Sequence, residues 1–492
     1  MNYPIIFKLL SFITLIMALA FGACTAVSAY YSENAVEAGA YEPWVTSIAI
    51  AVVASLVFYL PGRGASRKIF KKEAMCVVGL GWLLCSLIGA CPYFMILNCG
   101  FSNAFFESAS GFTSTGASVF GNVEEFPRSV LFWRALTQWI GGLGVVILFV
   151  AVLSSLGAGA KAIYSSESSL ETSSLERGRL KSGIWRILRI YLALSALCAA
   201  AFLAAGLPAF DSVCTMMATV STGGFSVKNA SFAAYSNRAA EWVAILFMFI
   251  GGTSFAVLLA AVKRDFKSVA RNTEFKAYAA IVAALSAAIF LSIFNYSTPS
   301  VSGAAGTFTD SVFQVVSILT STGFTSADYQ TWAPVTHVLI LFMLISGACT
   351  GSTSGGLKIA RIVGVSKISL NDIEKSFRPN VVRPVMMNGR ALGDSHARDM
   401  LSFTVLYALV SVAAMIILAA FEREMSLSGC ISAVMACISN IGPGFNEVGP
   451  TKNFGFLSDA SKIMLSILMV MGRLELYAIL ALFMPSLWKR FT

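Results

Sequence analysis

Four short turns rich in glycine, serine and threonine are the residues of this chain whose types and spacing suit cation chemistry. Their glycines, Gly116, Gly223, Gly323 and Gly442, recur at similar intervals. Glycine reaches positive φ without steric cost, so successive backbone carbonyls can point the same way. Four such turns around one axis could replace the hydration shell of a monovalent cation. The candidate ligands are Ser114, Thr115, Gly116, Ser221, Thr222, Gly223, Ser321, Thr322, Gly323, Asn440, Ile441 and Gly442.

Each turn follows a short apolar segment, at 101–112, 208–220, 308–320 and 427–439. A span needs about 20 apolar residues, so these segments predict half helices that enter the membrane and stop. Each half helix would direct its C-terminal partial negative charge toward the turns, which favours cations over anions. Non-helical backbone at this depth is tolerated only where protein buries it or where it lines a water-filled cavity.

The composition predicts a membrane protein. The chain has 492 residues, of which 57% are hydrophobic and 12% are charged, more apolar surface than one soluble core could bury. We read the first apolar stretch as a retained helix rather than a cleaved signal peptide. The ten expected spans lie near residues 5–28, 45–60, 74–98, 129–158, 188–205, 239–262, 277–297, 334–365, 400–421 and 460–487.

The recurrence of full helix, half helix, turn and full helix predicts an internal repeat. The expected fold is an all-α polytopic membrane protein with ten transmembrane helices, in which four pore-loop repeats surround a pseudo-fourfold axis. The expected divisions are two N-terminal helices in 1–69 and repeats at 70–160, 161–265, 266–366 and 367–492.

The net charge of +10 reflects topology rather than a surface for nucleic acid. Lysines and arginines concentrate in alternate loops, chiefly 63–72, 161–189, 263–276 and 358–398. With ten spans, the positive-inside rule places these loops and both termini in the cytoplasm. The intervening loops carry acidic residues instead. We expect membrane lipid to surround the helices.

A break in the span near 334–365 is the first candidate gate. The segment "GACTGSTSGG" at 347–356 cannot hold a regular lipid-facing helix well. One interpretation is a seam of small residues that packs helices closely. The other, which we favour, is a flexible loop that obstructs a pore below the turns. The candidate gate residues are Gly347, Gly351, Ser352, Thr353, Ser354, Gly355 and Gly356.

Arg473 is the second candidate gate. It lies near the middle of the last expected span, where a charge costs about 2.5 to 3.5 kcal/mol on insertion scales, so we expect it to face protein or water. Glu475 is close in sequence, but residues two apart on a helix do not share a face. A structural pairing elsewhere stays open. The functional hypothesis is an electrostatic barrier that cations must pass beneath the turns.

These motifs carry a resemblance to a known family. The strings "SGFTSTGAS", "TVSTGGFS", "LTSTGFTS" and "SNIGPGF", with "LTQWIGGLGVVIL" at 136–148, "FIGGTSFA" at 249–256 and "GRLELY" at 472–477, resemble the Trk/Ktr/HKT superfamily of potassium transporters. The resemblance is strongest to the TrkH-type branch and covers essentially the whole chain, including two extra N-terminal helices. Asn440 and Ile441 depart from the first three turns, although "NIGPG" is similar to the fourth turn of the family.

The resemblance implies potassium uptake across a bacterial inner membrane, with potassium bound at the carbonyls of the turns. It implies a homodimer and a separate cytoplasmic RCK-type nucleotide-binding regulatory subunit. It also implies roles for the broken segment as a gating loop and for Arg473 as a barrier. Sodium-preferring plant relatives place serine at the position of Gly116, so this glycine favours potassium. We expect no nucleotide or other cofactor on this chain, because no "GxGxxG" follows a predicted strand.

Two other classes of function are alternatives to a potassium pore. A membrane enzyme is disfavoured, because the two histidines, His337 and His396, lie near no recognisable nucleophile motif. A sodium- or proton-coupled cation symporter that uses the same pore stays open, because transporters also have broken helices. The sequence does not distinguish passive from coupled transport. The polar segments 162–181 and 366–398 are the expected docking surfaces for a regulatory partner.

Overall fold

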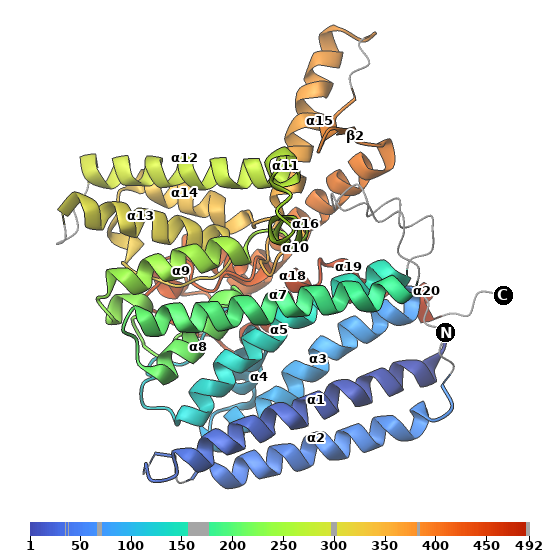
Figure 1. The fold of residues 1–492 in the computed structure, drawn as a ribbon, viewed down its shortest axis with the longest axis vertical. Helices are drawn as coiled ribbons and strands as arrows, with labels where there is room; N and C mark the ends of the chain where they lie inside the picture. The colour runs from blue at the N-terminus through green and yellow to red at the C-terminus, as the bar shows by residue number, and fades with distance from the viewer. Residues whose placement is uncertain are drawn as a thin grey trace.

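The structure, a computed structural model, describes the chain except for residues 35, 38, 66–70, 156–176, 297–302, 381–383 and 489–492. Most long helices run side by side, and the N-terminus and α20 (Pro485–Trp488), the last described helix, lie at the same end of the bundle (Figure 1). The long helices are α1 (Tyr3–Tyr30), α2 (Tyr41–Gly62), α3 (Lys71–Ile96), α5 (Arg128–Ser155), α7 (Arg177–Ala204), α12 (Thr273–Tyr296) and α16 (Asp394–Phe421).

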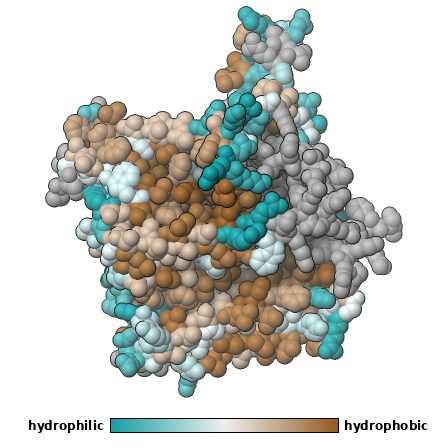
Figure 2. All heavy atoms as spheres, in the orientation of Figure 1, coloured by the Kyte–Doolittle hydropathy of each residue, from teal (hydrophilic) through white to brown (hydrophobic). Residues whose placement is uncertain are grey.

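Six of these helices are long and apolar enough to cross a membrane: α1, α2, α3, α7, α12 and α16. A seventh candidate is the pair α9 (Arg238–Gly251) and α10 (Phe255–Val262), which is bent by 103°. Apolar side chains cover most of the face in Figure 2, and hydrophilic ones gather toward the helix ends. The chain is therefore a mostly helical protein with several membrane-spanning segments. The expected number of ten stays a prediction.

Four half helices were expected, and each corresponds to a short helix that ends at a turn. They are α4 (Phe101–Phe112), α8 (Ala209–Val220), α13 (Gly303–Leu319) and α17 (Leu427–Ile438). The bounds of α4 are those expected. Helix α13 begins five residues earlier than expected, at Gly303.

The half helices pack in a cyclic order. Helix α5 contacts α8, α9 contacts α13, α14 (Pro334–Ile345) contacts α17, and α18 (Asp459–Arg473) returns to α4. The helix that follows each turn thus packs against the next half helix along the chain. This order brings the ends of all four half helices together.

Two spans that were expected to be continuous are broken. Residues 239–262 form α9 and α10, with a sharp bend at 252–254 where Ser254 caps α10 by accepting from Ala256 N–H. The last span ends at Arg473, and the chain turns through Glu475 and Leu476, both at positive φ. It then resumes as α19 (Tyr477–Leu482) and α20 (Pro485–Trp488). The prediction of one helix over 460–487 is wrong, because the chain leaves the helical path after Arg473, where Leu476 N–H donates back to the Met471 carbonyl in a local turn.

The remaining elements are short or lie outside the bundle. Helix α15 (Ile359–Phe377) projects away from the body, with the strands β1 (Met386–Met387) and β2 (Arg390–Ala391) beside it (Figure 1). The strands pair antiparallel. The others are α11 (Phe266–Arg271) and the 3-10 helices η1 (Ser231–Ala234), η2 (Tyr329–Thr331) and η3 (Asn446–Val448).

The N-terminal hairpin of α1 and α2 is fixed to the body by aromatic side chains. Trp44 and Phe21 pack with Trp133 of α5. Trp44 is fully buried, and its Nε1–H donates to Ser129 Oγ at 2.9 Å. A buried tryptophan needs such a partner for its N–H. The two extra helices are therefore an integral part of the bundle.

Candidate functional site

The four turns share one backbone conformation despite their different sequences. In each, the second residue after the half helix has positive φ: 52° at Ser114, 51° at Thr222, 55° at Ser321 and 55° at Asn440. Its N–H donates to the carbonyl three residues back, and the next N–H donates to the carbonyl five residues back, as in a Schellman motif. Positive φ in a β-branched residue such as Thr222 is a strained conformation of the kind that occurs at functional sites.

A glycine at positive φ follows two residues later in every turn. The four are Gly116, Gly224, Gly323 and Gly442, at 81°, 82°, 80° and 99°. The sequence alignment on "STG" placed Gly223 in this position and is one residue out of register. Ser221 is the right-handed C-cap that corresponds to Thr113, and Thr222 corresponds to Ser114. The shared "GF" followed by Ser or Thr at 224–226 and 323–325 was the signal for the correct register.

The turns contact one another in a closed ring. A Cβ on Gly116 would collide with the Gly223 carbonyl oxygen, and one on Gly224 with that of Thr322. One on Gly323 would collide with the Ile441 carbonyl oxygen, and one on Gly442 would lie 2.7 Å from that of Thr115. Each glycine thus faces the residue that precedes the corresponding glycine of the next turn. Only glycine fits at these four positions.

The hydroxyl groups of the turns are already hydrogen-bonded within the protein, whereas the carbonyl oxygens of Thr115, Thr322 and Ile441 accept no hydrogen bond among the described contacts. Thr115 Oγ1 lies 2.7 Å from Thr113 Oγ1 and accepts from Asn440 Nδ2 at 2.9 Å. Thr322 Oγ1 lies 2.7 Å from Thr320 Oγ1. These contacts favour the backbone carbonyls over the threonine hydroxyls as ligands for an ion.

The segment 346–358 forms no helix and lies against the turns. Thr222 Oγ1 donates to Thr353 Oγ1 at 3.1 Å, and Gly355 N–H donates to Ser321 Oγ at 2.6 Å. A Cβ on Gly355 would collide with the Ser439 carbonyl oxygen of the fourth turn. The segment therefore touches the second, third and fourth turns, and we name it the intramembrane loop.

Two buried charged side chains hold the intramembrane loop in place. Glu274, at the start of α12, accepts from Thr350 N–H at 2.6 Å and from Ala360 N–H at 3.2 Å. Lys358 Nζ donates to the Ser354 carbonyl, and to Ser354 Oγ at 3.1 Å. Gly351 and Gly356 both have φ of 71°. Gly347 donates its N–H to the Leu357 carbonyl at 2.8 Å, and Ser352 Oγ lies 2.8 Å from Ser354 Oγ.

Arg473 joins the loop to the first turn. It is the last residue of α18 and is 5% exposed. Its Nη1 donates to the Thr353 carbonyl, and its Nη2 donates to Ser114 Oγ at 3.2 Å. Glu475 does not pair with it. Instead, Glu475 Oε2 accepts from Arg361 Nη2 at 2.7 Å, an interaction between the last span and α15 that the sequence did not predict.

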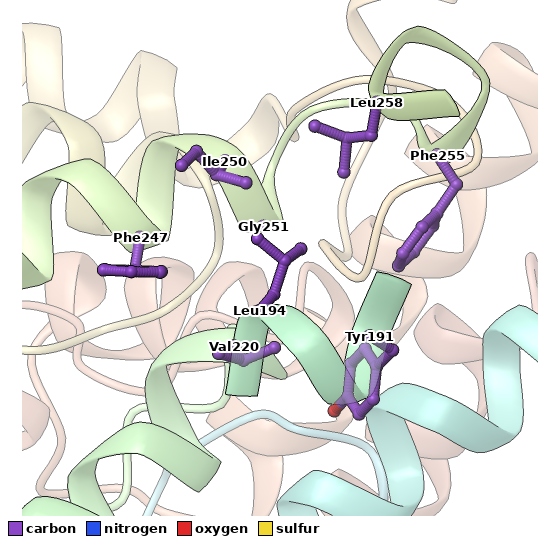
Figure 3. A pocket seen from close by; sticks show the side chains of 8 residues that line it. All are labelled: Tyr191, Leu194, Val220, Phe247, Ile250, Gly251, Phe255 and Leu258. Atoms are coloured by element: carbon purple, nitrogen blue, oxygen red, sulfur yellow. The ribbon is translucent and has the colours of Figure 1, made fainter. Parts of the chain in front are cut away.

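The hollow drawn in Figure 3 is not part of this site. Its walls come from α7, α8, α9 and α10 at the α9/α10 bend. The lining is apolar except for the Tyr191 hydroxyl, which donates to the Trp139 carbonyl at 3.0 Å. The hollow offers no ligand for an ion. Within the described residues, no three His, Cys, Asp or Glu side chains converge to hold a metal ion.

Comparisons with known proteins agree on one family. The sequence model of the TrkH family, described as a cation transport protein, matches residues 46–490. The Trk system potassium uptake protein TrkH of Vibrio parahaemolyticus is 32% identical over 461 residues, which cover 92% of this chain and 93% of that protein. TrkG of Escherichia coli is 31% identical over 454 residues, covering 90% and 92%.

A solved structure is similar over the full length. The crystal structure of the potassium transporter TrkH from Vibrio parahaemolyticus has a TM-score of 0.89 at 29% identity. The match covers 99% of this chain and 100% of that one.

Replacing Gly224 tests the register of the second turn. Because Gly224 has positive φ and faces the Thr322 carbonyl, we expect Gly224→Ala to lower the free energy of unfolding by about 1 to 3 kcal/mol. Thermal unfolding of the purified protein measures this loss. Gly100→Ala is the matched control, because its Cβ would meet nothing closer than 4.0 Å. Equal stability of the two variants would contradict the register.

Proposed function

The chain belongs to the TrkH family of cation transport proteins, and from this premise we propose that it is a potassium uptake protein whose ion path runs through the ring of four turns. The observation that carries this proposal is the closed contact between each glycine and the next turn. The four helix, half-helix and helix repeats surround the path, and the α1–α2 hairpin packs outside the first repeat.

The potassium ligands in this proposal are backbone carbonyls. The oxygens of Thr115, Gly223, Thr322 and Ile441 occupy one level of the ring, each beside a glycine of the preceding turn. A potassium ion that enters the ring would exchange its hydration water for such oxygens. The hydrogen bonds that occupy the threonine hydroxyls support this choice.

Charge around the path favours cations. The C-terminal ends of α4, α8, α13 and α17 all meet the turns, and the partial negative charge of a helix C-terminus attracts a cation within about one turn. No carboxylate is needed for this attraction. In this proposal potassium is the transported ion, and no cofactor is assigned to this chain.

The protein is placed in the inner membrane of a bacterium, with the basic loops and both termini in the cytoplasm. The alternating distribution of lysine and arginine supports this orientation. The position of the N-terminus and α20 at one end of the bundle supports placing both on the same side of the membrane (Figure 1). The turns then lie nearer the outer side, because the half helices enter from the end opposite the termini.

The intramembrane loop and Arg473 act as the gate. The loop touches three turns directly and the first through Arg473, so a cation that left the ring would meet it. Ser114, Thr222 and Ser321, the strained residues of three turns, each place a hydroxyl on the loop or on Arg473. Opening requires that these hydrogen bonds break together.

Regulation comes from the cytoplasmic side in this proposal. Helix α15 carries the loop at its start and projects from the body with the β1–β2 hairpin. This region, within 366–398, offers a docking surface for an RCK-type nucleotide-binding subunit, and two copies of the chain form a homodimer. The other expected docking surface, 162–181, lies almost entirely outside the described residues.

Substituting Gly116 tests the cation path. A serine at this position would place a side chain against the Gly223 carbonyl at a φ that favours glycine, so we expect Gly116→Ser to reduce the preference for potassium over sodium severalfold. Cation flux into liposomes, with potassium and sodium gradients imposed separately, measures this preference. Gly100→Ser is the matched control. An unchanged preference for potassium over sodium in a folded Gly116→Ser protein would show that the ring is not the selectivity filter.

Substituting Arg473 tests the gate. We expect Arg473→Ala to raise unregulated potassium flux about tenfold, because a fixed positive charge a few ångströms from a cation costs about 1 to 4 kcal/mol in partly screened surroundings. Arg473→Lys keeps the charge and should stay close to wild type in the same liposome assay. Potassium flux equal to or below that of wild type in correctly folded Arg473→Ala protein would contradict the barrier hypothesis.

A further inference from the structure

The segment "LTQWIGG" (136–142) of α5 lies directly against the first two turns. A Cβ on Gly141 would collide with the Phe112 carbonyl oxygen, and one on Gly142 would lie 2.8 Å from Ser221 Cβ. The two adjacent glycines thus let the backbone of α5 approach the ends of α4 and α8. This close approach brings the side chain one helical turn earlier, Gln138, to the second turn.

Gln138 holds the second turn with both ends of its amide. Its Nε2–H donates to the Gly223 carbonyl at 2.7 Å, and its Oε1 accepts from Phe225 N–H at 3.1 Å. The side chain is fully buried. Because Phe225 N–H can only donate, the oxygen must face it, and the orientation of the amide is settled by its partners. Gln138 therefore spans Gly224, the glycine at positive φ.

The corresponding positions of the other repeats carry methionine. Gly472 abuts the Ile438 carbonyl as Gly141 abuts that of Phe112, and Gly251 lies against the Val220 carbonyl. This equivalence aligns "TQWIGG", "FMFIGG" and "LMVMGR", and the similar string "FMLISG" completes the set. Met248, Met343 and Met469 are each fully buried. Of these four positions, only the first holds an amide.

We propose that Gln138 is a positioning residue that sets the preference of the ring for potassium over sodium. The inference rests on the proposed function, because it assigns a role within that ion path. Three of the four carbonyls at this level have no such donor among the described contacts, whereas the Gly223 carbonyl shares its lone pairs with an amide N–H. The ring is thus chemically asymmetric at a level where its backbone is nearly symmetric.

The physical effect is on ligand position and ligand strength. The amide fixes the Gly223 oxygen in place and lowers the negative charge it can offer to an ion. Number and field strength of carbonyl ligands both influence discrimination between potassium and sodium. Without the amide, the carbonyl could move toward the axis and offer a stronger field, which favours the smaller sodium ion.

The test replaces Gln138 with the residue that the other repeats use. Gln138→Met keeps side-chain length and removes both hydrogen bonds. We expect the ratio of potassium to sodium permeability to fall about threefold to tenfold, the scale of one or two lost buried hydrogen bonds. Reversal potentials of the purified protein in planar bilayers or liposomes measure the ratio. Met248→Leu, a volume-conserving change at the corresponding position of the second repeat, is the control.

A second readout does not require an open gate. Thermal unfolding in rising potassium or sodium chloride, at constant ionic strength, reports the binding of each ion to the folded protein. The expected result for Gln138→Met is a smaller difference between the potassium and sodium midpoints, while Met248→Leu keeps the wild-type difference. Flux measured in the Arg473→Ala background gives the same comparison if the wild-type gate stays closed.

The outcomes separate this inference from the proposed function. If wild type prefers potassium and Gln138→Met loses part of that preference while the control does not, Gln138 has the assigned role. If wild type prefers potassium and folded Gln138→Met has the same preference in both readouts, the role of Gln138 is overturned and the proposed function stands. If wild type discriminates between the ions in neither readout, both are overturned.

Discussion

Where a helix ends inside a membrane, its last backbone carbonyls have no water to accept hydrogen bonds from. The rest of the structure depends on how the four turns at the ends of the half helices meet this constraint. Each half helix ends in the same hydrogen-bonded cap, followed by a glycine at positive φ that abuts the next turn. Pro443 and Asn440 show that the fourth turn reaches this geometry with different side chains. The geometry is therefore a property of the backbone, and side chains adjust it. The cyclic packing of α5, α9, α14 and α18 on the half helices follows from bringing these four ends together.

Buried charged side chains beside the ring contact one irregular loop that is rich in glycine and serine. Lys358 and Glu274 bind backbone groups of this loop directly, and Arg473 binds it together with the first turn. Breaking a buried charged contact leaves a costly unpaired group, so these contacts stabilise the observed arrangement of the loop. The ion pair of Arg361 with Glu475 ties the start of α15 to the turn that follows α18. Movement of α15 would thus act on the loop and on the last span at once.

Several helix bounds and one broken span were predictable, because they depend on the local pattern of apolar and small polar residues. The apolar run at 101–112 predicted the bounds of α4, and the small polar residues at 347–356 predicted the broken span. Hydropathy could not predict the breaks after Gly251 and Arg473, because apolar residues continue on both sides of each break. The carbonyls of Gly251 and Gly252 accept from the loop at the first break, and the second break is a local backbone turn at positive φ. The register of the second turn was misread because "STG" at 221–223 imitates the other turns while the backbone uses Gly224. The contacts of Gln138 with Gly223 and of Arg361 with Glu475 could not be predicted, because each joins residues that are far apart in the sequence.

The central claim is that the four turns form one cation site. Thallium substitutes for potassium and scatters anomalously, so diffraction from the protein crystallised in a thallium salt tests the claim directly. An anomalous peak on the axis of the ring, at the level of the Thr115, Gly223, Thr322 and Ile441 carbonyl oxygens, is the expected result. Bound thallium elsewhere in the protein, with no peak between these oxygens, would contradict it.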